Sequence, residues 1–381
     1  SLYSLANPLH PDIWPSGMKF ESEIIAMTAS LMTSKPLEQT ELCGSTSSGG
    51  TESIILAAKS HRDYYRLKSG ITKPEIVACV SAHAAIEKAC ELLSIKLIQV
   101  PMDPKTFKCD VRAVEWAITP NTVMIYSSAP QFPQGVIDPI SALSELAVRY
   151  DTGLHVDCCL GGFVLPFARK LGYDIPDFDF DLPGVTSMSV DTHKYGCCLK
   201  GASVVLYRTK ELRHAQYFCY ANWTGGIYAT PTIAGSRSTG LIAQAWASLV
   251  AIGEEGFLEN TRNIIETTRA IGRAVAKIPE LEVIGNVEAM IVCFRSSTPE
   301  VNIYNVGDYM SKKGWMLNTL QHPSSIHLCV TLQHVGAEDR FIKDLTDAVV
   351  KAKETDGMVG NAAIYGMASS LPAGPVDEML R

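Results

Sequence analysis

The segment from Ser189 to Gly196 places two side chains suited to chemistry, His193 and Lys194, directly after an apolar stretch. A lysine in such a position is in most sequences an ordinary surface residue. If it is removed from water, however, its pKa falls and its amine becomes a nucleophile toward carbonyl carbon. His193 could contact a phosphate, and Lys200 adds a second positive charge nearby. The segment therefore predicts either a surface lysine or a Schiff-base lysine beside a phosphate.

A second segment, residues 44–53, combines glycines with small hydroxyl side chains and precedes a stretch with helical spacing, Ile54–Lys68. Backbone N–H groups at the start of a helix point outward and favour anions. The spacing differs from that of a P-loop and from that of a dinucleotide-binding glycine motif. The segment therefore predicts another kind of phosphate site, or else a glycine-rich turn with a Ser or Thr cap.

Two further side chains follow apolar stretches. Asp157 ends the segment Leu154–Asp157, where a carboxylate is costly unless it is paired. It could cap the next segment, which is the commoner case, or hold a cationic ring nitrogen. His83 lies at an expected strand-to-helix turn. A lone histidine there is usually a satisfied cap, but it could also stack on an aromatic cofactor.

The elements that must position these side chains alternate between strand-like and helix-like segments. The expected strands are Glu75–Val80, Lys96–Val100, Thr122–Ser127, Leu154–Asp157, Thr186–Val190 and Ser203–Tyr207. The expected helices between them include Ala84–Leu93, Asp110–Ile118 and Ile140–Tyr150. Apolar strands separated by helices indicate an α/β fold with a mostly parallel sheet covered on both faces.

Ligands of open α/β sheets bind at the carboxyl ends of the strands, where all four features would lie. Together they match the needs of pyridoxal 5'-phosphate, which requires a Schiff-base lysine, an acidic partner for its ring nitrogen and a phosphate site. The sequence therefore predicts this cofactor. No metal is expected.

The chain is predicted to divide into an N-terminal segment of residues 1–35, a large domain of residues 36–255 and a small C-terminal α+β domain of residues 256–381. The first boundary follows the break at Lys35 and Pro36, and the second lies near Gly256. Two helices, Thr239–Ile252 and Phe257–Ile278, are expected around this second boundary. The apolar stretch Leu241–Gly253 is interrupted by Gln244 and is expected to form a buried helix.

Composition narrows the possible functions. The 381 residues carry a formal net charge of −7, so no nucleic acid is expected as a partner. The 11 cysteines include no CxxC pair, which indicates a reducing, cytosol-facing compartment rather than a disulfide scaffold. The chain begins at Ser1 without an initiator methionine, which we interpret as a truncation.

Several motifs together resemble the sphingosine-1-phosphate lyase family, from about Asn7 to about Ala368. They are Asn7–Pro11, Ser47–Ser53, His155–Asp157, Asp191–Gly196 with Lys200–Gly201, Gly225–Ala229 and Thr232–Arg237. The segment around Lys194 is specific to this family, whereas the wider Asp…His-Lys pattern is shared with group II amino-acid decarboxylases.

The resemblance implies a fold type I architecture, with a mostly parallel seven-stranded sheet, and an obligate homodimer whose active sites are shared between subunits. Residues 1–35 would pack on the partner subunit. The resemblance also implies that Lys194 forms the Schiff base, that Asp157 pairs with the ring nitrogen and that His83 stacks on the ring. The cofactor phosphate would be bound by Ser48, Gly49, Gly50, Thr51 and His193, together with Gly235 and Ser236 of the neighbouring chain. Lys200 and His10 would bind the substrate phosphate, and Tyr365 would lie near the reacting end.

The activity so implied is a retro-aldol cleavage of phosphorylated sphingoid bases to phosphoethanolamine and a fatty aldehyde. The group that acts as base is left open, with His193, Lys194, the substrate phosphate and a tyrosine upstream of this chain as candidates. An amino-acid decarboxylase is the alternative enzyme, and a catalytically silent phosphate-binding or scaffold protein is the alternative from another class. The family resemblance places the protein at the endoplasmic reticulum membrane if an upstream anchor was removed, and otherwise in the cytoplasm.

Overall fold

The computed structural model describes residues 3–10, 12–355 and 357. The chain forms two compact units. The first comprises residues 1–104, 108–132 and 137–259, and the second comprises residues 105–107, 133–136 and 260–381. The division follows Glu259, and the domain boundaries expected from the sequence stay predictions.

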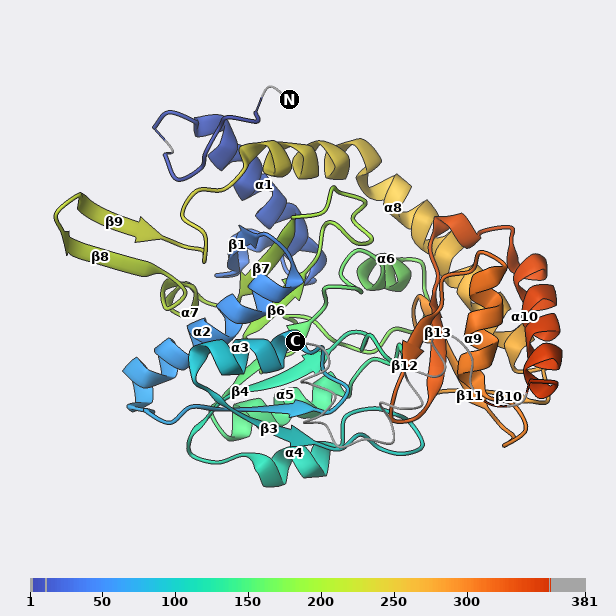
Figure 1. The fold of residues 1–381 in the computed structure, drawn as a ribbon. Helices are drawn as coiled ribbons and strands as arrows, with labels where there is room; N and C mark the ends of the chain where they lie inside the picture. The colour runs from blue at the N-terminus through green and yellow to red at the C-terminus, as the bar shows by residue number, and fades with distance from the viewer. Residues whose placement is uncertain (1–2, 11, 356, 358–381) are drawn as a thin grey trace. The chain divides into compact units, whose positions relative to one another are not determined.

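The first unit is built on a seven-stranded sheet in the order β1-β7-β6-β5-β4-β2-β3 (Figure 1). The strands are β1 Cys43–Ser47, β2 Glu75–Cys79, β3 Lys96–Val100, β4 Thr122–Ser128, β5 Gly153–Asp157, β6 Ser187–Val190 and β7 Ser203–Tyr207. β7 is antiparallel to both of its neighbours, and the remaining pairs are parallel. This confirms the expected mostly parallel sheet.

The expected strands form because their Val and Ile side chains are buried under helices on both faces. Every residue of β2, β4, β5, β6 and β7 is buried, whereas the edge strand β3 is partly exposed. β1 was not expected, since its sequence is Cys-Gly-Ser-Thr-Ser. It becomes a strand because its hydroxyl groups find partners. Thr46 donates to Glu21, and Ser47 shares a hydrogen bond with Ser53.

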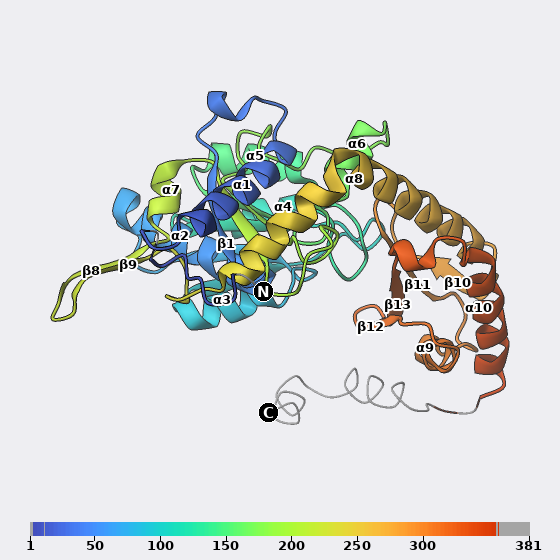
Figure 2. The same cartoon turned by 90° about the horizontal axis from the view of Figure 1, so that it is seen from above.

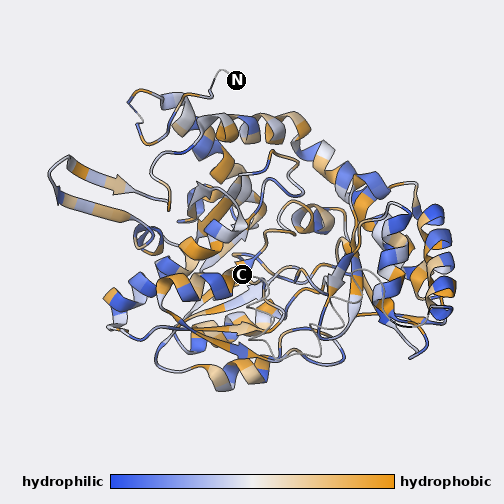
Figure 3. Ribbon diagram, viewed as in Figure 1, coloured by the Kyte–Doolittle hydropathy of each residue, from blue (hydrophilic) through white to orange (hydrophobic). Residues whose placement is uncertain are grey.

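Helices connect the strands and cover the sheet, and Figure 3 shows hydrophilic and hydrophobic residues side by side around them, as helices with one buried face require. The helices of this unit before residue 239 are α1 Pro15–Leu31, α2 Gly50–Ser69, α3 Ala85–Leu93, α4 Val111–Ala117, α5 Ile140–Arg149, α6 Leu165–Lys170 and α7 Lys210–His214, with a 3₁₀ turn at Leu37–Gln39. α1 packs on β1 and β7 of its own chain. Packing of residues 1–35 on a partner subunit stays a prediction.

A two-stranded hairpin extends away from the sheet of the first unit, as Figures 1 and 2 show. It consists of β8 Phe218–Trp223 and β9 Gly226–Thr230. Every residue of β8 is exposed, and the side chain of Ile227 in β9 is 87% exposed. These strands were not expected, because their residues bury little within the chain.

α8 extends over Thr239–Val275 and is interrupted at Gly253, whose φ of 62° is not helical. Two helices were expected here, and this break separates them. Among the described residues, α8 alone is long and apolar enough to cross a membrane by length and composition, and only 22% of its most apolar stretch is buried. The expectation of a buried helix at Leu241–Gly253 is therefore wrong, because much of its apolar surface is left uncovered by this chain.

The second unit contains a four-stranded antiparallel sheet in the order β10-β11-β13-β12. Its elements are β10 Leu281–Val283, β11 Ile291–Ser296, α9 Ile303–Lys312, β12 Asn318–Leu320, β13 Ser325–Cys329, a 3₁₀ turn at Leu332–His334 and α10 Glu338–Lys353. Phe294, Ile326 and Phe341 are completely buried in its core. This is the α+β pattern expected from the sequence, with the short strand β12 added.

Candidate active site

One cavity of about 330 Å³ in the first unit brings together all four features singled out in the sequence. Its lining includes residues of the segments around Gly49, Asp157 and Lys194, and also His83. It is lined by Ser48, Gly49, Gly50, Thr51, Glu52, Ile54, His83, Asp157, Cys159, Asp191, His193 and Lys194. These residues follow the carboxyl ends of β1, β2, β5 and β6. The cavity therefore lies at the sheet edge where ligands of open α/β folds bind.

Lys194 lies in this cavity with its side chain 32% exposed and its Nζ 3.0 Å from Oδ2 of Asp191. Burial by itself would lower the pKa of Lys194. The negative charges of Cys159 when ionised, of Asp191 and of Asp157 outweigh burial and raise this pKa above its usual value. The sequence-based expectation of a lowered pKa is therefore wrong for the lysine as it stands here, because acidic groups surround it.

Asp157 is buried at the end of β5 and is held from three sides. Its Oδ1 accepts hydrogen bonds from the backbone N–H of Cys159 at 3.0 Å and from the hydroxyl of Ser189 at 3.3 Å. Its Oδ2 accepts a hydrogen bond from the Tyr126 hydroxyl at 2.5 Å. These bonds fix the direction of the carboxylate within the cavity.

The charge of Asp157 is maintained despite its burial. Burial alone would raise the pKa of Asp157, but the positive charge of Lys194 and the hydrogen bond from Tyr126 lower it below its usual value. The carboxylate is therefore anionic at neutral pH. A buried, oriented anion of this kind suits a protonated ring nitrogen.

Tyr126 and His155 support Asp157 and were not singled out for this role by the sequence analysis. Their rings stack with centroids 5.5 Å apart, and the two ring nitrogens of His155 contact the hydroxyls of Ser187 and Ser189. Burial lowers the pKa of His155 to about 3, so this imidazole is neutral. The signal in the sequence is its spacing two residues before Asp157, which puts both side chains on one face of β5.

The phosphate end of the cavity is the first turn of α2. Gly49 caps this helix without any side-chain hydrogen bond, so the backbone donors of the first turn face the cavity. The N–H of Ser48 donates to the carboxylate of Glu52 at 2.7 Å, which holds the turn in shape. A Cβ atom at Gly50 would lie 2.8 Å from Sγ of Cys159, so this position has room only for glycine.

Two histidines flank this end of the cavity. Nδ1 of His193 accepts a hydrogen bond from the N–H of Ala202 at 3.3 Å, which leaves Nε2 toward the cavity, 3.6 Å from Oδ2 of Asp191. His83 is exposed, and its Nδ1 accepts a hydrogen bond from the N–H of Ala85 at 3.1 Å. Its ring lies edge-on to Phe132 at 6.5 Å between centroids. Both the cap and the cavity interpretations of His83 therefore fit the structure.

Other residues singled out in the sequence do not line this cavity. His10 and Ser236 are exposed, and Gly235 is partly exposed. Lys200 is exposed as well, and its Nζ donates to the backbone oxygen of His193 at 3.2 Å, just outside the cavity. Tyr365 lies outside the described residues. Their expected roles stay predictions.

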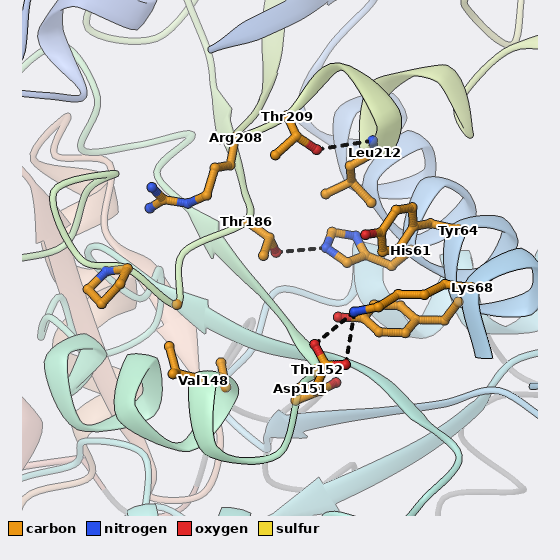
Figure 4. Close-up of a pocket in the computed structure, with 14 residues that line it drawn as sticks. His61, Tyr64, Lys68, Val148, Asp151, Thr152, Thr186, Arg208, Thr209 and Leu212 are labelled. Atoms are coloured by element: carbon orange, nitrogen blue, oxygen red, sulfur yellow. Dashed lines mark hydrogen bonds and ion pairs between the residues drawn. The ribbon is translucent and has the colours of Figure 1, made fainter. Parts of the chain in front are cut away.

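A second cavity of about 290 Å³ lies in the first unit among α2, α5 and the loop before β6 (Figure 4). Its polar side chains are engaged with protein partners. Lys68 pairs with Asp151 at 2.8 Å, and His61 contacts Thr186 at 2.8 Å. Arg208 donates to backbone oxygens, including that of Val185 at 2.6 Å. Because these groups have partners, this cavity offers less to a ligand than the one containing Lys194.

Comparison with known proteins first defines the class. The model of the pyridoxal-dependent decarboxylase conserved domain matches residues 7–297. The structure of Lactobacillus brevis glutamate decarboxylase is similar with a TM-score of 0.81 over 93% of this chain and 85% of that one, and its 21% identity shows the fold alone. Fold and site together thus define a pyridoxal-dependent enzyme with the expected fold type I architecture.

Relatives with higher identity define the family. The sphingosine-1-phosphate lyase of Dictyostelium discoideum is 50% identical over 98% of this chain and 69% of its own length, and that of Arabidopsis thaliana is 51% identical over 100% and 70%. The structure of the Burkholderia pseudomallei sphingosine-1-phosphate lyase is 44% identical, with a TM-score of 0.90 over 93% of this chain and 81% of that one. The chain belongs to the sphingosine-1-phosphate lyase family.

The residues of the cavity fit pyridoxal phosphate, the cofactor of this class. Lys194 offers the amine, Asp157 a buried anion, and the uncapped first turn of α2 a set of donors for a phosphate. Because Cys159 and Asp191 already lie close to Gly50, a side chain at position 50 would crowd this end of the cavity. The predicted cofactor is thereby confirmed, while the role of each residue is a matter for proposal.

Proposed function

We propose that this chain cleaves sphingosine 1-phosphate and related phosphorylated long-chain bases between C2 and C3, giving phosphoethanolamine and a fatty aldehyde. Pyridoxal phosphate, when bound, supplies an electron sink for the charge left on C2. The observation that carries the proposal is that Lys194, Asp157 and the uncapped first turn of α2 line one cavity in a chain about half identical to named lyases.

Each cavity residue has a task in this proposal. Lys194 binds the cofactor covalently, and Asp157, anionic and fixed by Tyr126, keeps the ring nitrogen protonated. His83 stacks on the ring. The phosphate binds to the residues at the start of α2 and to His193, namely Ser48, Gly49, Gly50, Thr51 and His193.

The substrate phosphate is assigned to cations outside the cavity. Lys200 is exposed within reach of the backbone of His193, so its ammonium can meet a phosphate that enters from solvent. His10 is proposed as a second contact, and Tyr365 is proposed to lie near the reacting end of the substrate.

The test of this proposal is an absorption spectrum of the purified protein, titrated with a phosphorylated sphingoid base, with the products identified by mass spectrometry. We expect a visible band that shifts on addition of substrate and the release of phosphoethanolamine and a fatty aldehyde. Lys194→Ala is expected to lose both the band and the turnover, because no other amine lines the cavity among the described residues. A yellow, active Lys194→Ala protein would refute the assignment, and release of CO₂ without aldehyde would indicate a decarboxylase.

We infer that the protein acts as a homodimer with shared active sites. Apolar side chains are exposed along the β8–β9 hairpin, including Phe218, Trp223 and Ile227, and the most apolar stretch of α8 is largely uncovered. Exposed apolar surface of this extent marks an interface. Gly235 and Ser236, which follow the hairpin and lie outside the cavity of their own chain, are proposed to complete the phosphate site of the neighbouring subunit.

A reducing, cytosol-facing location is proposed, in the cytoplasm or at the endoplasmic reticulum membrane. It is supported by the cysteines, all 11 of which are free thiols. Seven of them are buried, where a thiol packs as a small hydrophobic side chain: Cys79, Cys90, Cys109, Cys158, Cys159, Cys198 and Cys293.

A further inference from the structure

Asp191 is a buried carboxylate of the cavity that has no task in the proposed function. It is the first residue after β6, and only 2% of it is exposed. Its Oδ2 lies 3.0 Å from Nζ of Lys194. Its Oδ1 has no hydrogen-bond partner among the described residues. A buried carboxylate with one oxygen unpaired is costly, so its position calls for a reason.

Asp191 packs closely against the start of α2. A Cβ atom at Gly50 would lie 2.9 Å from Oδ2 and 3.1 Å from Oδ1 of Asp191. The carboxylate therefore lies directly against the first turn of this helix, at its positive end. It faces two positive groups at once, the helix end and the ammonium of Lys194.

Asp157 is the other aspartate of the cavity, and both of its oxygens already have partners. Its two oxygens accept hydrogen bonds from Tyr126, Ser189 and the N–H of Cys159. These partners hold it in the direction that suits a ring nitrogen. Lys194 forms its ion pair with Asp191, three residues earlier in the same turn. Asp191 therefore pairs with Lys194, and Asp157 is left for a ring nitrogen.

We propose that Asp191 is a positioning residue that binds the ammonium of Lys194 whenever this lysine is not bonded to the cofactor. It thereby holds the lysine in one place between turnovers and during loading of the cofactor. The proposal rests on the assignment of Lys194 in the proposed function. The residues that carry it are two side chains of this chain whose charged groups lie 3.0 Å apart.

The proposal has a chemical consequence for the lysine. The ionisable groups that face it are Asp157 and Cys159 after β5, Asp191 and His193 on its own loop, Glu52 of α2, and His83. Among these, Asp191 alone makes a direct ion pair with Nζ. Removing its charge should let Lys194 lose its proton at lower pH, and its amine should react faster with an acylating reagent.

The experiment measures this reactivity in the full chain from which the cofactor has been removed. Wild type and Asp191→Asn are treated with trace acetic anhydride between pH 7 and 10, and labelling of Lys194 is measured by mass spectrometry, with Lys200 as the internal reference. We expect Lys194 to be labelled about tenfold faster in Asp191→Asn at pH 8, with its pH profile shifted down by about one unit. Asp191→Glu, which keeps the charge, should restore slow labelling.

Asp179→Asn is the matched control. Asp179 is also 2% exposed and pairs with an arginine, Arg169, at 2.7 Å, but it does not line the cavity. Its substitution should leave the labelling of Lys194 unchanged. If Asp191→Asn is not folded by circular dichroism, Asp191→Ser removes the same charge with a smaller side chain.

The outcomes separate this proposal from the proposed function. Unchanged labelling of Lys194 in a folded Asp191 variant, or an equal effect of Asp179→Asn, would overturn the role of Asp191. The proposed function is tested separately by the absorption band and products of the wild-type protein with its cofactor. Since labelling is measured without cofactor, it decides the role of Asp191 even if that band were missing.

Discussion

Two carboxylates in one cavity have different environments, and this difference sets their tasks. Asp157 is fixed by a phenol, a hydroxyl and a backbone N–H, which stabilise its charge toward a ring nitrogen. Asp191 has one oxygen on Lys194 and one without a partner. In the proposed function, the same residue type is assigned to the cofactor at one position and to the lysine at the other. Environment, rather than residue type, decides the role.

Lys200 allows a test of the substrate-phosphate assignment at the scale of one side chain. It is exposed and its ammonium donates a hydrogen bond to the backbone oxygen of His193, so Lys200→Ala should leave the fold and the cofactor band intact. We expect KM for the phosphorylated substrate to rise by roughly tenfold, since a charge-assisted hydrogen bond is lost. Steady-state kinetics beside the cofactor spectrum measure both effects.

Lys210→Ala, at an exposed position on α7, is the matched control for the loss of a surface charge. It should change neither KM nor the spectrum. If Lys200→Ala weakened cofactor absorbance as much as it raised KM, its assignment to the substrate phosphate would be wrong.

At the scale of elements, the start of α2 is the proposed site for the cofactor phosphate. Gly50 begins the helix, and a side chain there would meet Cys159 at 2.8 Å and Asp191 at 2.9 Å. Gly50→Ala should therefore displace the first turn and weaken pyridoxal phosphate binding by roughly tenfold, as overpacking at a rigid site does. Titration of the cofactor-free protein with pyridoxal phosphate, followed by absorbance, measures this.

Gly307→Ala is the control for this prediction. Gly307 lies inside α9, and a Cβ atom there would make an ordinary contact of 3.5 Å with Ile326. The substitution should leave cofactor affinity unchanged and should stabilise the helix slightly. Equal cofactor affinities of Gly50→Ala and wild type would show that the first turn of α2 does not bind the phosphate.

The contact between α2 and the loop before β6 predicts how stability depends on pH. His61 is completely buried, and burial lowers its pKa from the usual value near 6.5 to about 4 (Figure 4). Below pH 6.5 the unfolded chain therefore binds a proton that the folded chain does not. The stabilisation from neutral His61 is complete above pH 6.5 and is lost as the pH falls toward 4, by about 1.4 kcal/mol per pH unit.

Urea unfolding of the cofactor-free protein between pH 6 and 4.5 measures this dependence. His61→Gln should reduce the slope by about 1.4 kcal/mol per pH unit, because one such group is removed. The remaining slope includes His155, whose pKa is also lowered by burial, to about 3. His214→Gln, at an exposed position on α7, is the matched control. An unchanged slope in His61→Gln would contradict the assignment.

Elements with a buried apolar pattern could be predicted from the sequence, and those without one could not. β7 begins and ends as expected, at Ser203 and Tyr207, because all of its residues are buried and most are apolar. β1 was missed because its hydroxyl side chains bond to partners far along the chain, such as Glu21. The β8–β9 hairpin was missed because it buries little within its own chain.

The same distinction holds for the site. Lys194, Asp157 and the glycines of the α2 turn could be found because each stands at the end of a predicted element. Tyr126 was not found, since its hydroxyl meets Asp157 only when β4 and β5 pair in the sheet. Asp191 is part of a motif in the sequence, but only the structure shows that its Oδ1 is buried without a hydrogen-bond partner among the described residues.

At the scale of the whole molecule, the proposed dimer explains features that a single chain leaves without a partner. Apolar side chains of the hairpin are exposed, as is Val250 of α8 at 52%. Gly235 and Ser236, expected near a cofactor phosphate, do not line the cavity of their own chain. A twofold assembly in which each chain completes the site of the other would account for both.

Complementation between two inactive chains tests this assembly directly. Lys194→Ala removes the Schiff-base lysine, and Ser236→Asp places a negative charge where the partner's cofactor phosphate is expected, so each variant should be inactive alone. In a mixed dimer one site carries both substitutions and the other carries neither. If subunits mix at random, half of the dimers are mixed and half of their sites are intact, so co-expression should restore about a quarter of wild-type activity.

The control is Lys194→Ala co-expressed with Asp157→Ala. These two residues line one cavity, so this pair should restore no activity. No recovery from the Lys194→Ala and Ser236→Asp pair, in dimers shown by light scattering to have formed, would mean that each chain builds its site alone.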